Sequence, residues 1–209
     1  MDNKNISIVI AVHDRASELE QNLPHFLQLQ QLGVGEVVVV DDASTDDTPD
    51  VLKRLKAQYD GLYTTFLPDS GHNPSRLRLA LTIGVKATHG DWIVLCDINR
   101  PPMTADWLAP LSEADGELVL IYNNGITPEA PGHYQYFDHL EQAVRLLTKA
   151  ERHSGRGHRG RWFKDWRGHY DALAVRRERV FDAIMNYDRP LRGGRLMVWQ
   201  LAVLISNLR

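Results

Sequence analysis

The segment that most constrains the fold of this 209-residue chain is residues 36–48, which read Glu-Val-Val-Val-Val-Asp-Asp-Ala-Ser-Thr-Asp-Asp-Thr. Four consecutive valines without polar alternation are typical of a strand buried on both faces of a parallel sheet between helices. The strand ends at two adjacent carboxylates, Asp41 and Asp42. Ligands of open α/β sheets bind beyond the carboxyl ends of the strands. Either these oxygens accept hydrogen bonds from a base or sugar, or one of them caps the next helix.

The first half of the chain alternates apolar strands with amphipathic helices, which predicts parallel pairing with right-handed crossovers. Ser17-Glu-Leu-Glu20 resembles a capping box and predicts a helix start. The predicted class is α/β, with a mostly parallel sheet flanked by helices in a single domain. Besides the valine strand, strands are expected over 6–12, 63–67, 92–96 and 117–122, and helices over 17–31, 49–58 and 75–88.

The second half has a different character. Residues 122–132 are rich in turn formers and predict a loop, and a helix is expected over 137–152. The glycine-rich cationic segment 152–161 favours no single conformation. A short helix is expected near Val180 and Ile184, and a last one over 196–208.

Composition excludes several classes of protein. A net charge of −3 gives no general attraction to nucleic acid or anionic lipid. Cys96 is the single cysteine, so an internal disulfide and a multi-cysteine zinc site are ruled out, and we interpret it as a core residue. No signal peptide is recognisable before the first strand, and no apolar run reaches the roughly 20 residues that span a bilayer. We therefore expect a cytoplasmic protein.

Three segments together resemble the inverting glycosyltransferases of family 2. Residues 7–15, Ser-Ile-Val-Ile-Ala-Val-His-Asp-Arg, are similar to the opening strand of that family. Residues 38–48 resemble its Val-Val-Asp-Asp-Gly-Ser-Thr-Asp-Gly-Thr signature. Residues 84–99 resemble the helix and strand that lead to its metal-binding Asp-X-Asp. The resemblance covers about the first half of the chain.

This resemblance implies a GT-A fold, which is Rossmann-like, and a donor that is a nucleoside diphosphate sugar, with UDP expected. By the same resemblance, the backbone of Ala11 and Val12 and the ring of His13 would receive the nucleobase. Asp42 would accept a hydrogen bond from the base, and Arg76 would contact the base or phosphate unless it is simply solvated. Asp41 would have a structural role in the acidic pair. Arg78 lies on the same segment as Arg76, and the same two interpretations apply to it.

The metal motif departs from the family pattern, because this chain has Asp97-Ile98-Asn99. The resemblance implies that Asn99, with Asp97 as a second ligand, would hold Mg²⁺ or Mn²⁺. Asparagine offers a carbonyl oxygen without the charge, and a charge pair at 4 Å is worth about 4 kcal/mol at an effective dielectric near 20. We therefore expect a weakened metal site.

The catalytic base is a second departure. Inversion needs a base that takes the proton of the acceptor hydroxyl. Arg195 and Leu196 stand where the family places its late carboxylates, and arginine cannot act as a base. Asp171 and Asp188 match positions with structural roles, so the catalytic residue stays unknown.

The resemblance also divides the chain into a nucleotide-sugar-binding half, 1–122, and an acceptor-side half, 123–209. The basic segment 152–167 could close over a diphosphate, remain a solvated loop, or bind RNA. The apolar helix at 196–208 could pack on the sheet, pair with a second copy as a homodimer, or lie on a membrane surface. The expected partners are the donor and a glycan or lipid-linked glycan acceptor, without nucleic acid. Contact with the inner face of the membrane would be peripheral at most.

Two rival functions follow from the same residues. A GT-A-like nucleotide-sugar-binding or regulatory protein that has lost catalysis would explain the missing base and the changed metal motif. A phospho-acceptor signalling domain would also place acidic residues after a strand. That function needs an acceptor aspartate and a lysine at the ends of later strands. The chain offers Asp97 as the aspartate but no suitable lysine.

Overall fold

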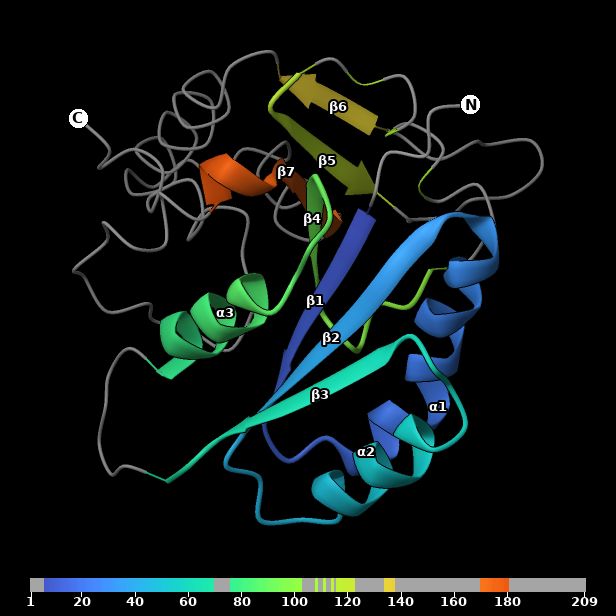
Figure 1. The fold of residues 1–209 in the computed structure, drawn as a ribbon, viewed down its shortest axis with the longest axis vertical. Coiled ribbons are helices and arrows are strands. Elements are labelled where there is room, and N and C mark those ends of the chain that lie inside the picture. The colour runs from blue at the N-terminus through green and yellow to red at the C-terminus, as the bar shows by residue number, and fades with distance from the viewer. Residues whose placement is uncertain are drawn as a thin grey trace, which may run out of the picture.

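A computed structural model of the chain describes residues 6–69, 76–102, 108, 111, 114, 116–122, 134–137 and 170–180. Helices flank one seven-stranded sheet in this part of the chain, which confirms the predicted α/β class (Figure 1). The strands are β1 (Ile6–Val12), β2 (Val34–Asp42), β3 (Leu62–Leu67), β4 (Trp92–Cys96), β5 (Leu118–Tyr122), β6 (Tyr134–Phe137) and β7 (Tyr170–Arg176). The helices are α1 (Ala16–Gln28), followed by a 3-10 turn (Leu29–Leu32), α2 (Thr48–Lys56) and α3 (Arg76–Lys86).

The strand order is β3-β2-β1-β4-β7-β5-β6. The four strands from the first half of the chain, β3, β2, β1 and β4, pair in parallel, as their alternation with helices predicts. The pairs β4–β7, β7–β5 and β5–β6 are antiparallel. β7 therefore lies between β4 and β5, although it follows both in the sequence. This arrangement makes the sheet mixed and joins the two halves of the chain in one layer.

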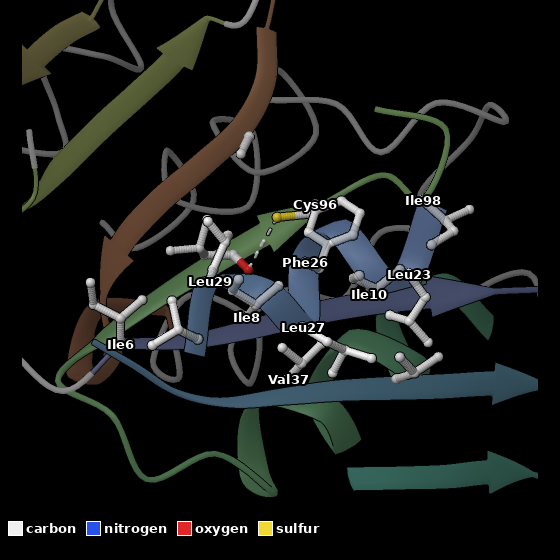
Figure 2. Packing of buried hydrophobic residues seen from close by; sticks show 14 of the residues in the cluster. Ile6, Ile8, Ile10, Leu23, Phe26, Leu27, Leu29, Val37, Cys96 and Ile98 are labelled. Atoms are coloured by element: carbon white, nitrogen blue, oxygen red, sulfur yellow. Dashed lines mark hydrogen bonds between the residues drawn. The ribbon is translucent and has the colours of Figure 1, made fainter. Parts of the chain in front are cut away.

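The valine strand is buried on both faces, which is the property that its lack of alternation predicts. Val37 and Val39 face the cluster that α1 and α2 cover, together with Ile8 and Ile10 of β1 (Figure 2). Val40 faces α3 on the opposite side, where Gly84 allows close approach of the helix. Figure 1 shows α1 and α2 side by side, with α3 apart from them. Cys96 belongs to this buried cluster, so its interpretation as a core residue is confirmed.

Three features differ from the sequence-based expectations. β7 was not anticipated, although the run 172–175 is apolar and fully buried. β6 ends at Phe137, where a helix was expected to begin, and the rest of that helix lies outside the described residues. The capping box is wrong, because α1 begins at Ala16 and its N-cap, Arg15, makes no side-chain cap hydrogen bond.

Candidate functional site

Apart from Arg76, which begins α3, the site residues expected from the sequence lie at the carboxyl ends of three adjacent strands. Val12 is paired with Asp41 across β1 and β2, so His13 and Asp42 follow at the same level. Ile10 is paired with Cys96 across β1 and β4, so Asp97 follows close to the end of β1. Ala11 and Val12 are the last two residues of β1. The fold thus brings the ends of β2, β1 and β4 together at one edge of the sheet.

His13 has an exposed ring whose two nitrogens both face oxygen atoms. Its Nδ1 lies 2.7 Å from the backbone oxygen of Asp42, and its Nε2 lies 3.5 Å from Oδ2 of Asp14. The side chain is 59% exposed. These contacts fix the ring by its edge, while much of its surface remains accessible to a ligand that stacks on it.

Asp42 forms an ion pair with Arg76, at the start of α3. Arg76 Nη2 lies 2.5 Å from Asp42 Oδ1, and the two side chains are only 22% and 17% exposed. Arg76 also donates to the Pro68 carbonyl at 3.5 Å and lies 3.9 Å from Asp69. The alternative of a solvated Arg76 is therefore wrong. The pair presents a negative and a positive group side by side. The side chain of Arg78 lies outside the described residues.

Asp41 has a different role from its neighbour. It is buried, and its Oδ1 accepts a hydrogen bond of 3.0 Å from the backbone N–H of Ser44. It therefore shapes the turn after β2. Neither carboxylate of the pair caps α2, because the N-cap position belongs to Asp47 and the N–H of Thr48 donates to Asp46. The capping alternative is thus excluded.

The segment Asp97-Ile98-Asn99 forms a tight turn after β4. Asp97 Oδ1 accepts hydrogen bonds from the backbone N–H of Asn99 at 3.0 Å and from its Nδ2 at 2.9 Å. The N–H of Arg100 closes the turn on the carbonyl of Asp97 at 2.9 Å. Ile98 is buried beside α1 (Figure 2). Asn22 of α1 donates a hydrogen bond to the Ile98 carbonyl, which ties the turn to that helix.

The turn offers oxygen ligands to a hard divalent cation. Asn99 is exposed and Asp97 partly exposed, and carboxylate and amide oxygens are the donors that Mg²⁺ accepts. No group of three or more His, Cys, Asp or Glu side chains that could hold a metal occurs within the described ranges. The two side chains therefore fit a cation whose other ligands come from a bound diphosphate or water.

A set of side chains that sequence analysis missed joins the loop after β1 (13–16) to the loop after β2 (43–48). Asp14 Oδ1 accepts from the N–H groups of Thr45 at 2.7 Å and Asp46 at 3.3 Å. The N–H of Asp14 donates to Ser44 Oγ at 2.9 Å. Asp46 Oδ2 in turn accepts from the N–H of Ala16, the first residue of α1, at 3.1 Å. We call these contacts the loop interlock.

The hydrogen bonds of the interlock favour the charged form of both carboxylates and lower the pKa of each. The N–H of Thr45 is the main reason why the pKa of Asp14 lies below its usual value. For Asp46, burial acts to raise the pKa, but hydrogen bonds from Thr48 and Ala16 outweigh it, and the pKa is lowered. The polar run Ser44-Thr-Asp-Asp-Thr48 was the signal in the sequence that could have revealed this network, since such residues bond to nearby backbone.

No catalytic base can be placed among the described residues. The backbone of Asp171 lies in β7, but its side chain is not among those described. Asp188, Arg195, Leu196, the basic segment 152–167 and the predicted helices at 137–152 and 196–208 fall outside the described part, apart from Phe137.

The sheet, with a site at the carboxyl ends of its first strands, defines a GT-A fold. Glucosyl-3-phosphoglycerate synthase from Mycobacterium tuberculosis, solved with Mn²⁺, UDP and phosphoglyceric acid, has this fold. It aligns with a TM-score of 0.53 and 22% identity over 86% of this chain and 58% of its own. A mannosyltransferase from Pyrobaculum calidifontis, solved with GDP-Man and Mn²⁺, aligns with a TM-score of 0.46 and 22% identity, over 55% of this chain and 34% of its own.

The sequence of the same region matches a family model. Residues 7–98 match the model of glycosyl transferase family 2, so this segment is similar to that family. A curated relative from Pseudomonas syringae pv. syringae (strain B728a) is 27% identical over 124 residues, which are 56% of this chain. It is undecaprenyl-phosphate 4-deoxy-4-formamido-L-arabinose transferase, and the match spans 35% of its length. This chain thus spans about a third of that relative. Among the described residues, no helix is long and apolar enough to cross a membrane.

Proposed function

We propose that this protein transfers a sugar from a nucleoside diphosphate sugar to an acceptor hydroxyl. The observation that carries the proposal is the half-buried Asp42–Arg76 pair beside the exposed ring of His13, at the carboxyl edge of the sheet. A planar base needs a surface on which to stack and polar groups that meet its edge. Aromatic rings serve for stacking, and fixed donors and acceptors at the edge give selectivity.

The pair favours a particular class of base. Asp42 can accept from a ring N–H, and Arg76 can donate to a neighbouring carbonyl oxygen. Uracil presents N3–H beside O4, so it matches this order, and guanine offers a similar N1–H beside O6. Cytosine and adenine present an acceptor nitrogen beside an amino group, which is the reverse order. We propose UDP as the nucleotide, with the backbone of Ala11 and Val12 beside the base.

Asp97 and Asn99 would meet the sugar and diphosphate, together with Mg²⁺ or Mn²⁺. A divalent cation supplies charge that stabilises the diphosphate as it leaves. Asn99 brings no negative charge, so the protein contributes one formal charge rather than two to the cation. We propose that metal binding is weak without the nucleotide and stronger with it.

Transfer with inversion would proceed by attack of the acceptor oxygen on the anomeric carbon from the face opposite the diphosphate. The new bond joins the anomeric carbon to the acceptor oxygen, and the bond from that carbon to the phosphate oxygen breaks. The acceptor proton goes to a base, and UDP leaves with the bonding electrons. We propose that residues 1–122 bind the donor and that residues 123–209 supply the acceptor side, including this base.

The acceptor is proposed to be a glycan or a lipid-linked glycan. The curated relative acts, by its name, on undecaprenyl phosphate, which is a lipid phosphate. We propose a cytoplasmic protein whose contact with the inner face of the membrane is peripheral.

Calorimetric titration of the purified protein with UDP-sugars and GDP-mannose, with and without Mn²⁺, tests the proposal. We expect saturable binding of UDP-sugars, and replacement of Asp42 by alanine should weaken it about ten- to a hundredfold, since a hydrogen bond to a charged group is worth about 1.5–3 kcal/mol. Asp60→Ala, at an exposed position, is the matched control. If none of the nucleotide sugars binds, the proposal is refuted.

A nucleotide-sugar-binding protein without catalysis is the second candidate. It is favoured by Asn99 in the metal motif and by Arg195 and Leu196 where carboxylates are expected. Donor binding without hydrolysis, and without transfer to any of a panel of glycan and polyprenyl phosphate acceptors, would support it over the enzyme.

A further inference from the structure

His13 and Asp42, which would contact the base, are each followed by a residue with left-handed backbone geometry. Asp14, after His13, has a φ of 51°, and Ala43, after Asp42, has a φ of 53°. Non-glycine residues adopt positive φ at a cost, and surrounding contacts must hold them there. The loop interlock supplies these contacts, because it bonds the loop that contains Asp14 to the loop that contains Ala43.

Asp14 links the interlock directly to His13. One oxygen of its carboxylate, Oδ1, accepts from Thr45 and Asp46 in the second loop. The other, Oδ2, faces Nε2 of His13 at 3.5 Å. Since Nδ1 of His13 is held by the Asp42 carbonyl at 2.7 Å, the ring is fixed from both sides.

Asp46 fixes the other end of the same loop. Its carboxylate accepts from the N–H of Ala16 with Oδ2 and from the N–H of Thr48 with Oδ1, at 3.1 and 2.9 Å. The N–H of Arg15 donates to Thr48 Oγ1 at 2.9 Å. The loop 13–16 is thereby anchored at its start through Asp14 and at its end through Asp46.

We propose that Asp14 and Asp46 are positioning residues for the nucleotide, which hold the ring of His13 against the base without touching the ligand. The proposal rests on the proposed function, because it assumes that a base stacks on His13. A ring that is fixed before binding loses less conformational freedom when the base arrives. The interlock would therefore increase affinity for the base, and it would do so equally for ligands with one phosphate or two.

Calorimetric titration of the full chain with UMP and with UDP tests this. Asp14→Ala and Asp46→Ala should each weaken both ligands by the same factor, roughly three- to tenfold, as expected when one ordered side chain is released. Asp14→Asn should recover part of the loss, because its amide oxygen can still accept from Thr45. Asp47→Ala, at an exposed neighbour whose side chain makes no cap hydrogen bond, should leave both affinities unchanged.

A second measurement does not depend on any ligand. The imidazole NMR resonances of His13 in the free protein should move in Asp14→Asn and stay in place in Asp47→Asn. If the Asp14→Ala variant fails to fold, the Asp14→Asn variant tests the proposal in its place. If wild type binds neither UMP nor UDP, the proposed function fails, and the His13 resonances alone then decide whether Asp14 positions the ring. Unchanged affinities in folded Asp14 and Asp46 variants, or unmoved resonances, would overturn the inference.

Discussion

Asn22, in the middle of α1, donates a 3.0 Å hydrogen bond from its Nδ2 to the backbone carbonyl of Ile98. The N-terminus of the same helix is bonded to Asp46 through the N–H of Ala16. One helix therefore connects the turn that would meet the diphosphate with the loops that would hold the base. The two ends of the proposed donor site are positioned by a single rigid element.

We expect Asn22→Ala to loosen the turn 97–99 and leave the base end intact. Affinity for UDP with Mn²⁺ should fall by about tenfold, the lower end of what supporting residues of a metal site contribute. Affinity for UMP should not change. Calorimetry with both ligands checks this, and Gln21→Ala, at the exposed neighbouring position, is the control. An equal loss for UMP would contradict this division of the site.

Glu36 lies near the start of β2, at the end of the sheet opposite the proposed donor site, and its side chain is only 9% exposed. Its Oε1 accepts hydrogen bonds from Ser7 Oγ at 2.6 Å and from the N–H of His89 at 2.5 Å. Ser7 Oγ also accepts from the N–H of Gly90. Burial acts to raise the pKa of Glu36, but the hydrogen bonds from Ser7 and His89 outweigh it and lower the pKa below its usual 4.5.

Because the folded-state pKa of Glu36 is lowered, its contribution to stability is full above its usual pKa and is lost as the pH falls through the folded value. We expect Glu36→Gln to reduce the free energy of unfolding at pH 7 by about 1.5–3 kcal/mol, the value of hydrogen bonds to a charged group. The loss should shrink on acidification below pH 4. Urea denaturation at several pH values measures it, and the exposed Glu20→Gln should show at most a small effect.

Gly84 sets the distance between α3 and the sheet. A Cβ at this position would lie 2.5 Å from Cγ1 of Val9 and 3.1 Å from Cγ2 of Val40. Gly84→Ala should therefore destabilise the protein by about 1–3 kcal/mol through overpacking. Helix propensity alone would predict a gain of about 1 kcal/mol, so the sign of the change decides between the two effects. Lys86→Ala, at an exposed position of the same helix, should be nearly neutral in thermal denaturation.

Ala43 is strained in the position that follows Asp42, with a φ of 53°. We expect Ala43→Gly to raise the free energy of unfolding by about 1 kcal/mol, because glycine adopts this region without steric cost. Ala57→Gly is the matched control, since Ala57 has a helical φ of −72° and should lose stability on the same change. Equal effects at both sites in chemical denaturation would show that Ala43 is not strained.

The parallel half of the fold could be predicted from the sequence, because unbroken valine and isoleucine runs mark strands buried on both faces. The pairing of β7 between β4 and β5 could not, because local patterns carry no information about which distant strand becomes a neighbour. Its segment Ala172-Leu-Ala-Val175 is short, and alanine favours helices over strands.

At the site, the ends of the predicted strands indicated Asp42 and Asp97, but the contacts that these side chains make could not be predicted. Arg76 could be placed on a helix, but its half-buried ion pair with Asp42 depends on how α3 crosses the sheet. Asp14 and Asp46 were hidden because polar loop residues usually face solvent. Their contacts arise from the closeness of two loops that are adjacent only in the folded sheet.

The position of β7 also affects how the chain folds during synthesis. The outer edge of β4 consists of unpaired backbone groups until residues 170–176 leave the ribosome, long after the first parallel strands can form. Such edges recruit other strands, and slow long-range pairing extends their exposure. We therefore expect nascent chains to be most prone to aggregation after β4 has been synthesised and before β7 has emerged.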